Sequence, residues 1–153
     1  MDHAGVSGFV LFNRLVEPDI DLRDEKVSNS FNLSHETDYR PALRIAALLE
    51  GLLKADVCCG TGIFDGATVA KMLLAGTQVV QTVSALFRNG PANIQTMIRD
   101  LEQWMALQGY NSLADFRGKL SRRHFGDPWA YTHAQYARLL MNPEELVKNW
   151  PAV

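Results

Sequence analysis

Short apolar runs alternate along the chain with stretches of helical periodicity. The runs at residues 9–12, 56–59 and 79–82 are bounded by glycine or polar residues and predict three strands. The first run is apolar at every position, which suits a strand buried on both faces. Residues 15–40 are rich in charge, serine and asparagine without sustained periodicity, so we expect a long loop with room for a short hairpin.

Apolar residues that recur every three or four positions predict helices between and after these strands. The predicted helices cover residues 41–53, 66–75, 94–105, 112–118 and 129–146. Asp65 is the expected N-cap of the second helix, and Gly76 is its expected C′ residue. The apolar stripe from Ile94 to Met105 is expected to pack against the rest of the fold, with Gly109 as the C-cap of that helix.

The order strand, helix, strand over residues 56–82 predicts a βαβ unit. Such units are right-handed and have parallel strands in nearly all known cases. We therefore predict an α/β fold in which all three strands lie parallel and the helices lie on the outside. Three strands are too few to close an eight-stranded barrel.

Composition and charge exclude several classes of protein. At 153 residues, with 47% hydrophobic and 21% charged residues, the chain fits one globular domain. Its net charge of −2 gives no overall basic field for nucleic acid or an anionic membrane. The apolar runs at 41–53 and 67–75 are shorter than the roughly 20 residues that cross a bilayer. The first residues lack a signal-peptide pattern, and we expect a cytoplasmic protein.

Two strand ends could together hold a phosphate group. Thr61 and Gly62 stand between a predicted strand and a helix, where backbone N–H groups can bind an anion. The next predicted strand ends in Thr82, Val83 and Ser84 at the same edge of a parallel sheet. Phosphates in α/β barrels are commonly bound between two such loops. A tight strand-to-helix turn without a ligand explains the glycine of the first loop equally well.

The stretch ADVCCGTGIFDGATVAKMLLAGTQVVQTVSALFRNGP, residues 55–91, resembles the phosphate-binding region of the dihydroorotate and dihydropyrimidine dehydrogenase family. The similar features are the glycine turn, the helix ending in LLAG, the valine-rich strand, the small hydroxyl residue and the final Gly-Pro. GVSGFVLFNR near the start and FRGKLSRRHFGDPWAYTHAQYARLL near the end also resemble family segments. The resemblance thus extends over almost the whole chain and is most specific over residues 55–91.

This resemblance implies a partial TIM (β/α)8 barrel that binds FMN. Residues 1–128 would form C-terminal βα units of the barrel, and residues 129–153 would form a helical tail. The FMN phosphate would be bound at the residues that match the family's site, which are Thr61, Gly62, Val83 and Ser84. Asn13 matches an asparagine that contacts the pyrimidine substrate beside the flavin. Three positions depart from the glycines typical of the family: Cys59, Thr61 and Val83.

The implied function is a flavin-dependent oxidoreductase that oxidises a dihydropyrimidine with FMN as hydride acceptor. No catalytic residue is assigned, because the family's Cys or Ser base and its flavin-contacting lysine are expected in a segment before Met1. We therefore expect inactivity of this chain alone, and a complementing N-terminal barrel half or a homo-oligomer as partner. The alternative is a non-catalytic truncated barrel fragment or a phosphate-binding or assembly module.

The remaining reactive side chains fit structural roles better than chemical ones. Cys58 and Cys59 lie within a predicted strand and are expected to pack as small apolar residues rather than act as nucleophiles. The four histidines have no metal-ligand spacing, so no metal is predicted. Residues 122–124, Arg-Arg-His, are read as a solvated tail, with contact to a cofactor phosphate as the alternative.

Overall fold

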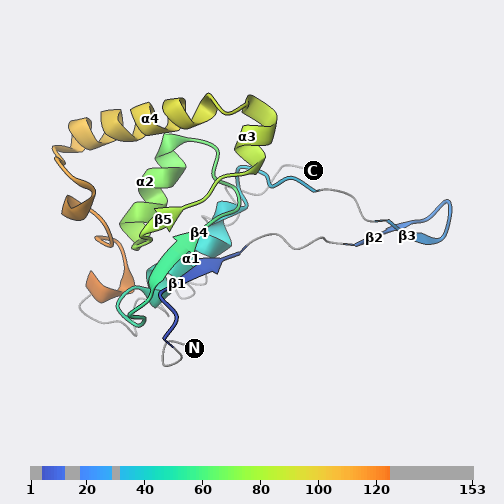
Figure 1. Ribbon diagram of the computed structural model, residues 1–153, viewed down its shortest axis with the longest axis horizontal. Coiled ribbons are helices and arrows are strands. Elements are labelled where there is room, and N and C mark those ends of the chain that lie inside the picture. Colours follow the sequence, from blue (N-terminus) through green and yellow to red (C-terminus); the bar gives the residue numbers. More distant parts are fainter. Residues whose placement is uncertain (1–4, 13–17, 29–31, 125–153) are drawn as a thin grey trace, which may run out of the picture.

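The protein has a mixed α/β fold, seen in a computed structural model that describes residues 5–12, 18–28 and 32–124 (Figure 1). Three strands form one sheet in the order β1-β4-β5, and both pairings are parallel. These strands are β1 (Gly8–Leu11), β4 (Asp56–Cys59) and β5 (Val79–Val80). The predicted parallel arrangement is confirmed, although β5 is two residues shorter than expected because the chain leaves the sheet before α3.

In the described ranges the α-helices that accompany the sheet are α1 (Tyr39–Leu49), α2 (Gly66–Ala75), α3 (Ser84–Asn89) and α4 (Asn93–Gln108). The predicted caps of α2 are confirmed. The Asp65 carboxylate accepts a hydrogen bond from the Thr68 N–H at 2.7 Å. Gly76 ends the helix with φ +107°, a left-handed conformation that favours glycine. Gly109 ends α4 in the same way.

The helix predictions need three corrections. Helix α1 ends at Leu49, so the predicted helix over residues 41–53 extends too far. The predicted helix over residues 112–118 is only a 3-10 turn at Leu113–Asp115. The Asp115 carboxylate accepts hydrogen bonds from the N–H groups of Asn111 and Ser112, each at 2.8 Å, which closes a tight turn instead of extending a helix. Helix α3 was not predicted. The expected tail helix at 129–146, and the domain boundary at residue 128, lie outside the described residues.

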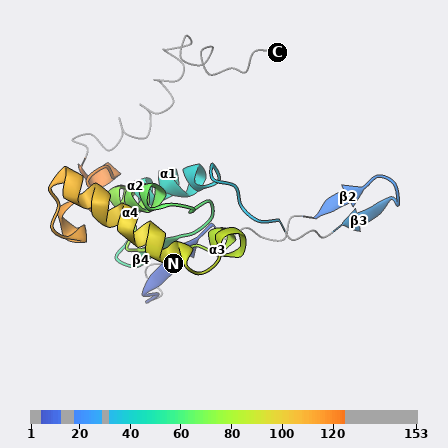
Figure 2. The same cartoon turned by 90° about the horizontal axis from the view of Figure 1, so that it is seen from above.

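Helices α1 and α2 cover one face of the sheet, and the core lies between them and the strands (Figures 1 and 2). Successive residues of a strand point to opposite faces, so alternate residues of β4 point toward the helices. Val57 and Cys59 of β4 are buried there, against Ala46 of α1 and Met72 of α2. Small residues in α1 let this helix approach the sheet closely.

The other face of the sheet is open in the described part of the chain. Val10, Cys58 and Val79 are in register across the three strands; Val10 and Val79 on the outer strands are 52% and 53% exposed, whereas Cys58 on the central strand is buried. The prediction that residues 9–12 form a strand buried on both faces is therefore wrong. The strand alternation places Leu11 and Val57 on the opposite face, against the helices.

Helix α4 packs along α2 through a close backbone approach. A Cβ atom built on Gly66 would lie 2.5 Å from the Met97 carbonyl oxygen, so only glycine fits at this contact. Met97 is buried there, whereas Ile94 and Ile98 are exposed. The expectation that the whole stripe of α4 is packed was therefore only partly right, because α4 touches α2 along a narrow line.

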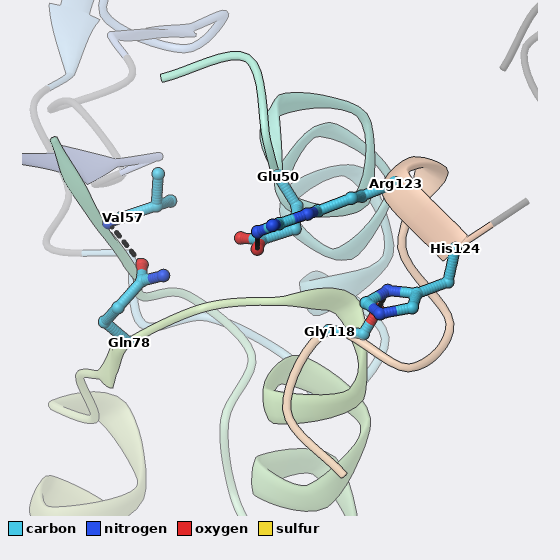
Figure 3. Close-up of polar contacts among 6 residues, drawn as sticks. All are labelled: Glu50, Val57, Gln78, Gly118, Arg123 and His124. Atoms are coloured by element: carbon cyan, nitrogen blue, oxygen red, sulfur yellow. Dashed lines mark hydrogen bonds and ion pairs between the residues drawn. The ribbon is translucent and has the colours of Figure 1, made fainter. Parts of the chain in front are cut away.

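The segment 118–124 closes the end of the sheet at which β4 and β5 begin. Figure 3 shows the Arg123 guanidinium beside the Glu50 carboxylate, 3.9 Å apart, and the His124 ring against the Gly118 carbonyl oxygen, 2.8 Å from Nδ1. Nearby, the Gln78 side chain accepts a hydrogen bond from the Val57 N–H at 2.7 Å. Arg123 and His124 are exposed, as expected for a solvated segment, and these contacts hold the segment against the body of the protein.

A short hairpin stands away from the sheet and helices (Figures 1 and 2). Its strands β2 (Asp19–Asp21) and β3 (Lys26–Ser28) pair antiparallel, and every residue from 18 to 27 is exposed. The short hairpin that we allowed for in the predicted loop over residues 15–40 is therefore present.

Replacing Gly66 with alanine is expected to lower the free energy of unfolding. The added Cβ would push α4 from α2, and overpacking of this kind costs about 1–3 kcal/mol. The matched control is Gly8→Ala, because a Cβ there meets the Asp56 carbonyl oxygen at an ordinary 3.4 Å. Urea unfolding followed by circular dichroism measures both variants, and equal midpoints for the two would contradict the close α2–α4 contact.

The open sheet face is expected to make the isolated chain associate and melt at a modest temperature. Burying one large apolar side chain contributes about 1.5–3 kcal/mol, a large share of the roughly 5–15 kcal/mol that stabilises a domain. Replacing both Val10 and Val79 with threonine should reduce binding of an apolar dye, whereas Leu107→Thr on exposed α4 should not. A monodisperse monomer with a cooperative melt above about 60 °C, high for a mesophile domain, would contradict this expectation.

Candidate functional site

A pocket of about 340 Å³ lies where β4 and β5 end. One wall is the turn Gly60–Ile63 after β4, and a second is formed by Gln81, Val83 and Ser84 after β5. The third wall comes from residues 32–34 of the loop that leads to α1. The prediction that Thr61, Gly62 and Ser84 converge on one concave spot at the strand ends is confirmed.

Ser34 links all three walls of the pocket through hydrogen bonds. Its hydroxyl and its backbone N–H both donate to Ser84 Oγ, at 2.8 and 2.9 Å. The same hydroxyl oxygen accepts a hydrogen bond from the Gly62 N–H at 3.1 Å. Ser84 Oγ accepts both bonds, so its own proton remains available to donate elsewhere. Ser34 is buried, and these bonds hold the loop against both strand ends.

The turn after β4 is held in a left-handed conformation. Thr61 and Gly62 have φ values of +70° and +71°, and for threonine this conformation is unusual. The Thr61 hydroxyl donates to the carbonyl oxygen of Phe12, which fastens the turn to the end of β1. The Thr82 hydroxyl donates to the Ile63 carbonyl oxygen at 2.8 Å and fastens it to the chain after β5. The turn is therefore fixed from both neighbouring strands.

Gly62 has a packing role as well as a place at the pocket. A Cβ atom built on it would lie 2.4 Å from the Tyr39 backbone nitrogen and 3.0 Å from the His35 carbonyl oxygen. The turn that precedes α1 thus rests directly on this glycine. Close packing alone explains why a glycine is needed here, independently of any ligand.

The pocket wall mixes polar and apolar groups and, among the described residues, carries no charge. None of the described residues that line it is Lys, Arg, His, Asp or Glu, so the polar groups that an anion could meet there are neutral hydroxyl, amide and backbone N–H groups. Val83, at 59% exposed, presents an apolar side chain at the rim. Any bound phosphate would thus depend on neutral hydrogen-bond donors.

The two cysteines of β4 are structural, as predicted. Both are buried, and burial raises the pKa of the Cys58 thiol and raises that of Cys59 to about 11. A raised pKa keeps both thiols protonated near neutral pH and makes them poor nucleophiles.

Across the described residues there is no group of three His, Cys, Asp or Glu side chains placed to hold a metal ion. No helix in those ranges is long and apolar enough to span a membrane.

Comparison with known proteins supports the family resemblance. Dihydroorotate dehydrogenase A (fumarate) of Lactococcus lactis subsp. cremoris (strain MG1363) is 42% identical over 59 residues, 39% of this chain and 19% of that protein. A putative dihydroorotate dehydrogenase A (fumarate) of Streptococcus agalactiae serotype Ia is 40% identical over 60 residues, with the same coverage. The resemblance to dihydroorotate dehydrogenases is confirmed. No protein-family model matches the sequence.

The likeness to dihydroorotate dehydrogenases extends to the fold. A crystal structure of DHODH from Eimeria tenella in complex with ferulenol has a TM-score of 0.61 to this chain at 14% identity. The match covers 76% of this chain and 32% of that one. The chain therefore spans about one third of a solved DHODH chain, and the matched region about one fifth of the curated dihydroorotate dehydrogenases.

Sequence reasoning from the dehydrogenase resemblance found two walls of the pocket and missed the third. Thr61, Gly62, Val83 and Ser84 all line it, whereas the substrate-binding candidate Asn13 lies outside the described residues. Ser34 was missed because it lies in the loop predicted from residues 15–40, where no periodicity or motif distinguishes one serine from another. Residues 122–124 lie at the opposite end of the strands, which rules out the alternative that they reach the pocket.

Replacing Ser84 with alanine is expected to destabilise the protein. The change removes the acceptor of two hydrogen bonds from buried Ser34, and each unsatisfied buried donor costs about 1–3 kcal/mol. Ser84→Thr keeps the Oγ atom and is the control. We expect the urea midpoint of Ser84→Ala to fall clearly below that of Ser84→Thr, and an unchanged midpoint would show that the Ser34 linkage contributes little.

Proposed function

We propose that this chain is a portion of a flavin-dependent oxidoreductase of the dihydroorotate dehydrogenase-like type, with its βα units forming part of a TIM barrel. The observation that carries the proposal is the pocket at the ends of β4 and β5. It gathers, from two neighbouring βα loops, the four residues that match the family's FMN phosphate site: Thr61, Gly62, Val83 and Ser84. In barrels of this kind a phosphate commonly occupies such a place.

The residues present fit a phosphoryl group. A pocket of about 340 Å³ has room for a phosphate and part of its chain. Ser84 can donate its hydroxyl proton into this space, because its oxygen already accepts two hydrogen bonds from Ser34. The Gly62 N–H donates to the Ser34 hydroxyl. To bind a phosphate, it would have to donate to both oxygens or give up its bond to Ser34. The site therefore offers fewer free donors than the glycine-rich turns typical of the family.

Bound FMN would supply the hydride-accepting step, and this chain would supply binding and orientation. Ser34, Ser84 and the turn at Thr61–Gly62 would hold the phosphate end. A dihydropyrimidine substrate near Asn13 follows from the resemblance and stays a prediction. Within the described part of the chain, no Cys, His, Asp, Glu or Lys lines the pocket to act as a base. We therefore expect very little dihydroorotate oxidation by this chain alone, even with added FMN.

A non-catalytic role is the second candidate, and two observations favour it. The Gly62 N–H is already paired with Ser34, and the open face at Val10 and Val79 offers a surface for assembly with another barrel portion. In this role the chain would complete a barrel or bind a phosphate without turnover. Flavin absorbance of the purified protein separates the two candidates, because the assembly role needs no flavin.

The phosphate site is tested by comparing FMN with riboflavin, which lacks the phosphate. Flavin fluorescence titration should give tighter binding of FMN, because hydrogen bonds to a charged group contribute about 1.5–3 kcal/mol. Val83→Asp places a carboxylate at the pocket rim and should weaken FMN binding at least tenfold by like-charge repulsion. Asparagine has the shape of aspartate without its charge, so Val83→Asn should change the affinity for FMN less than threefold.

Equal affinities for FMN and riboflavin would contradict a phosphate site in this pocket. The proposal would also be contradicted if the Val83→Asp variant bound FMN as tightly as the Val83→Asn variant. Circular dichroism of both variants serves as the folding control, and the exposed position of Val83 makes a folding defect unexpected.

A further inference from the structure

A groove of about 390 Å³ lies between α1 and α2, which Figure 2 shows side by side. Sites for small molecules commonly have volumes of about 300–1,000 Å³, so the groove is large enough for one. Its lining combines the basic side chains of Arg40, Arg44 and Lys71 with apolar side chains, which include Leu43 and Leu74. No acidic residue lines it among those described. We call it the α1–α2 groove.

The apolar groups of the α1–α2 groove lie deeper than its charges. Ala47 and Ala75 are buried and Leu74 is half-buried, whereas all three basic residues are exposed. The small side chains at the two alanine positions leave room above them for a ligand. The groove therefore has an apolar floor and a basic rim, which suits a molecule with an apolar body and one negatively charged end.

The three positive charges at the rim lack a negative partner in the described part of the chain. Arg40 and Arg44 are one helical turn apart on α1, a spacing at which like charges destabilise a helix. No carboxylate of a described residue forms an ion pair with Arg40, Arg44 or Lys71, whereas Arg123 is paired with Glu50. An anion bound at the rim would relieve the repulsion between these cations.

Tyr39, the first residue of α1, responds to the positive charge of the rim. Lys71 donates a hydrogen bond to its hydroxyl at 3.1 Å, and the Lys71 ammonium lies 5.0 Å from the centroid of its ring. The hydrogen bonds from Lys71 and Arg40, together with their positive charges, lower the pKa of Tyr39 against the opposing effect of burial. The same field that favours a tyrosinate would favour a bound anion.

We propose that the α1–α2 groove binds a single-chain amphiphile with a carboxylate head. The hydrocarbon chain would cover Leu43 and Leu74, and the guanidinium groups of Arg40 and Arg44 would hold the carboxylate. Arginine suits this head because its planar fork matches the two oxygens of a carboxylate. The apolar groups form the floor of a groove and do not protrude from a flat face, so one free chain fits them better than the surface of a bilayer does.

Short amphiphiles test the two halves of the groove separately. Isothermal titration calorimetry of the full chain would compare octanoate with butyrate, which lacks four methylene groups, and with 1-octanol, which lacks the charge. Octanoate should bind at least tenfold more tightly than butyrate, because each methylene that leaves water favours binding. It should also bind at least tenfold more tightly than 1-octanol, because hydrogen bonds between arginine and a carboxylate are charge-assisted.

The groove variant Arg40→Gln/Arg44→Gln should weaken octanoate binding at least tenfold and change the affinity for 1-octanol less than threefold. Glutamine has nearly the helix propensity of arginine, and the substitution removes a like-charge pair. We therefore expect a thermal midpoint equal to or above that of the original chain, which separates lost binding from lost folding. The matched control, Lys26→Gln/Arg99→Gln, removes two exposed charges elsewhere and should leave octanoate binding within twofold.

Three results would overturn the proposal. The first is equal affinity for octanoate and 1-octanol. The second is a groove variant that binds octanoate as tightly as the original chain, as it would if amphiphiles bound to the open sheet face. The third is cosedimentation with phosphatidylglycerol vesicles that requires Arg40 and Arg44 while octanoate fails to bind, since the groove would then contact a membrane surface. FMN is absent throughout, so the outcome is independent of the proposed function.

Discussion

β4 is hydrogen-bonded to a parallel strand on each side, and this pairing decides where the chemistry of the chain can lie. Parallel strands end at the same edge of a sheet, so the turns after β4 and β5 become neighbours. Their residues then form two walls of one pocket. Ser34 adds the third wall by bonding to both, which makes the loop before α1 part of the site. Strand direction thus sets the position of the pocket, and the composition of the loops decides which groups line it.

Within the described residues, the same sheet is covered by helices on one side and open on the other. Alternation along the strands sends Val57 and Cys59 to the helices and leaves Val10 and Val79 on the open face. Parallel sheets are normally buried on both faces. In the described part of this chain the helices cover one face, and the second face lacks a packing partner. This one-sided packing agrees with a match that spans about a fifth of the curated relatives.

Local signals in the sequence were sufficient for much of this fold. Asp65 and Gly76 marked the ends of α2 because caps act within one turn of the helix. The βαβ order fixed strand direction, since the crossover rule applies to nearly every such unit. Residues 112–118 were mistaken for a helix because the capping hydrogen bonds that close the turn there compete with helical periodicity. Ser34 could not be found from the sequence, because its role depends on contacts with residues 28 and 50 positions away.

We propose that the two turns after β4 and β5 hold the phosphate of FMN. Amide ¹⁵N–¹H chemical shifts recorded during a titration with FMN test it most directly, because each backbone N–H reports its own surroundings. We expect the largest changes at Thr61, Gly62, Val83 and Ser84, with little change at the basic residues Arg40, Arg44 and Lys71 of α1 and α2. Large changes at Arg40, Arg44 and Lys71, with none at the four pocket residues, would contradict it.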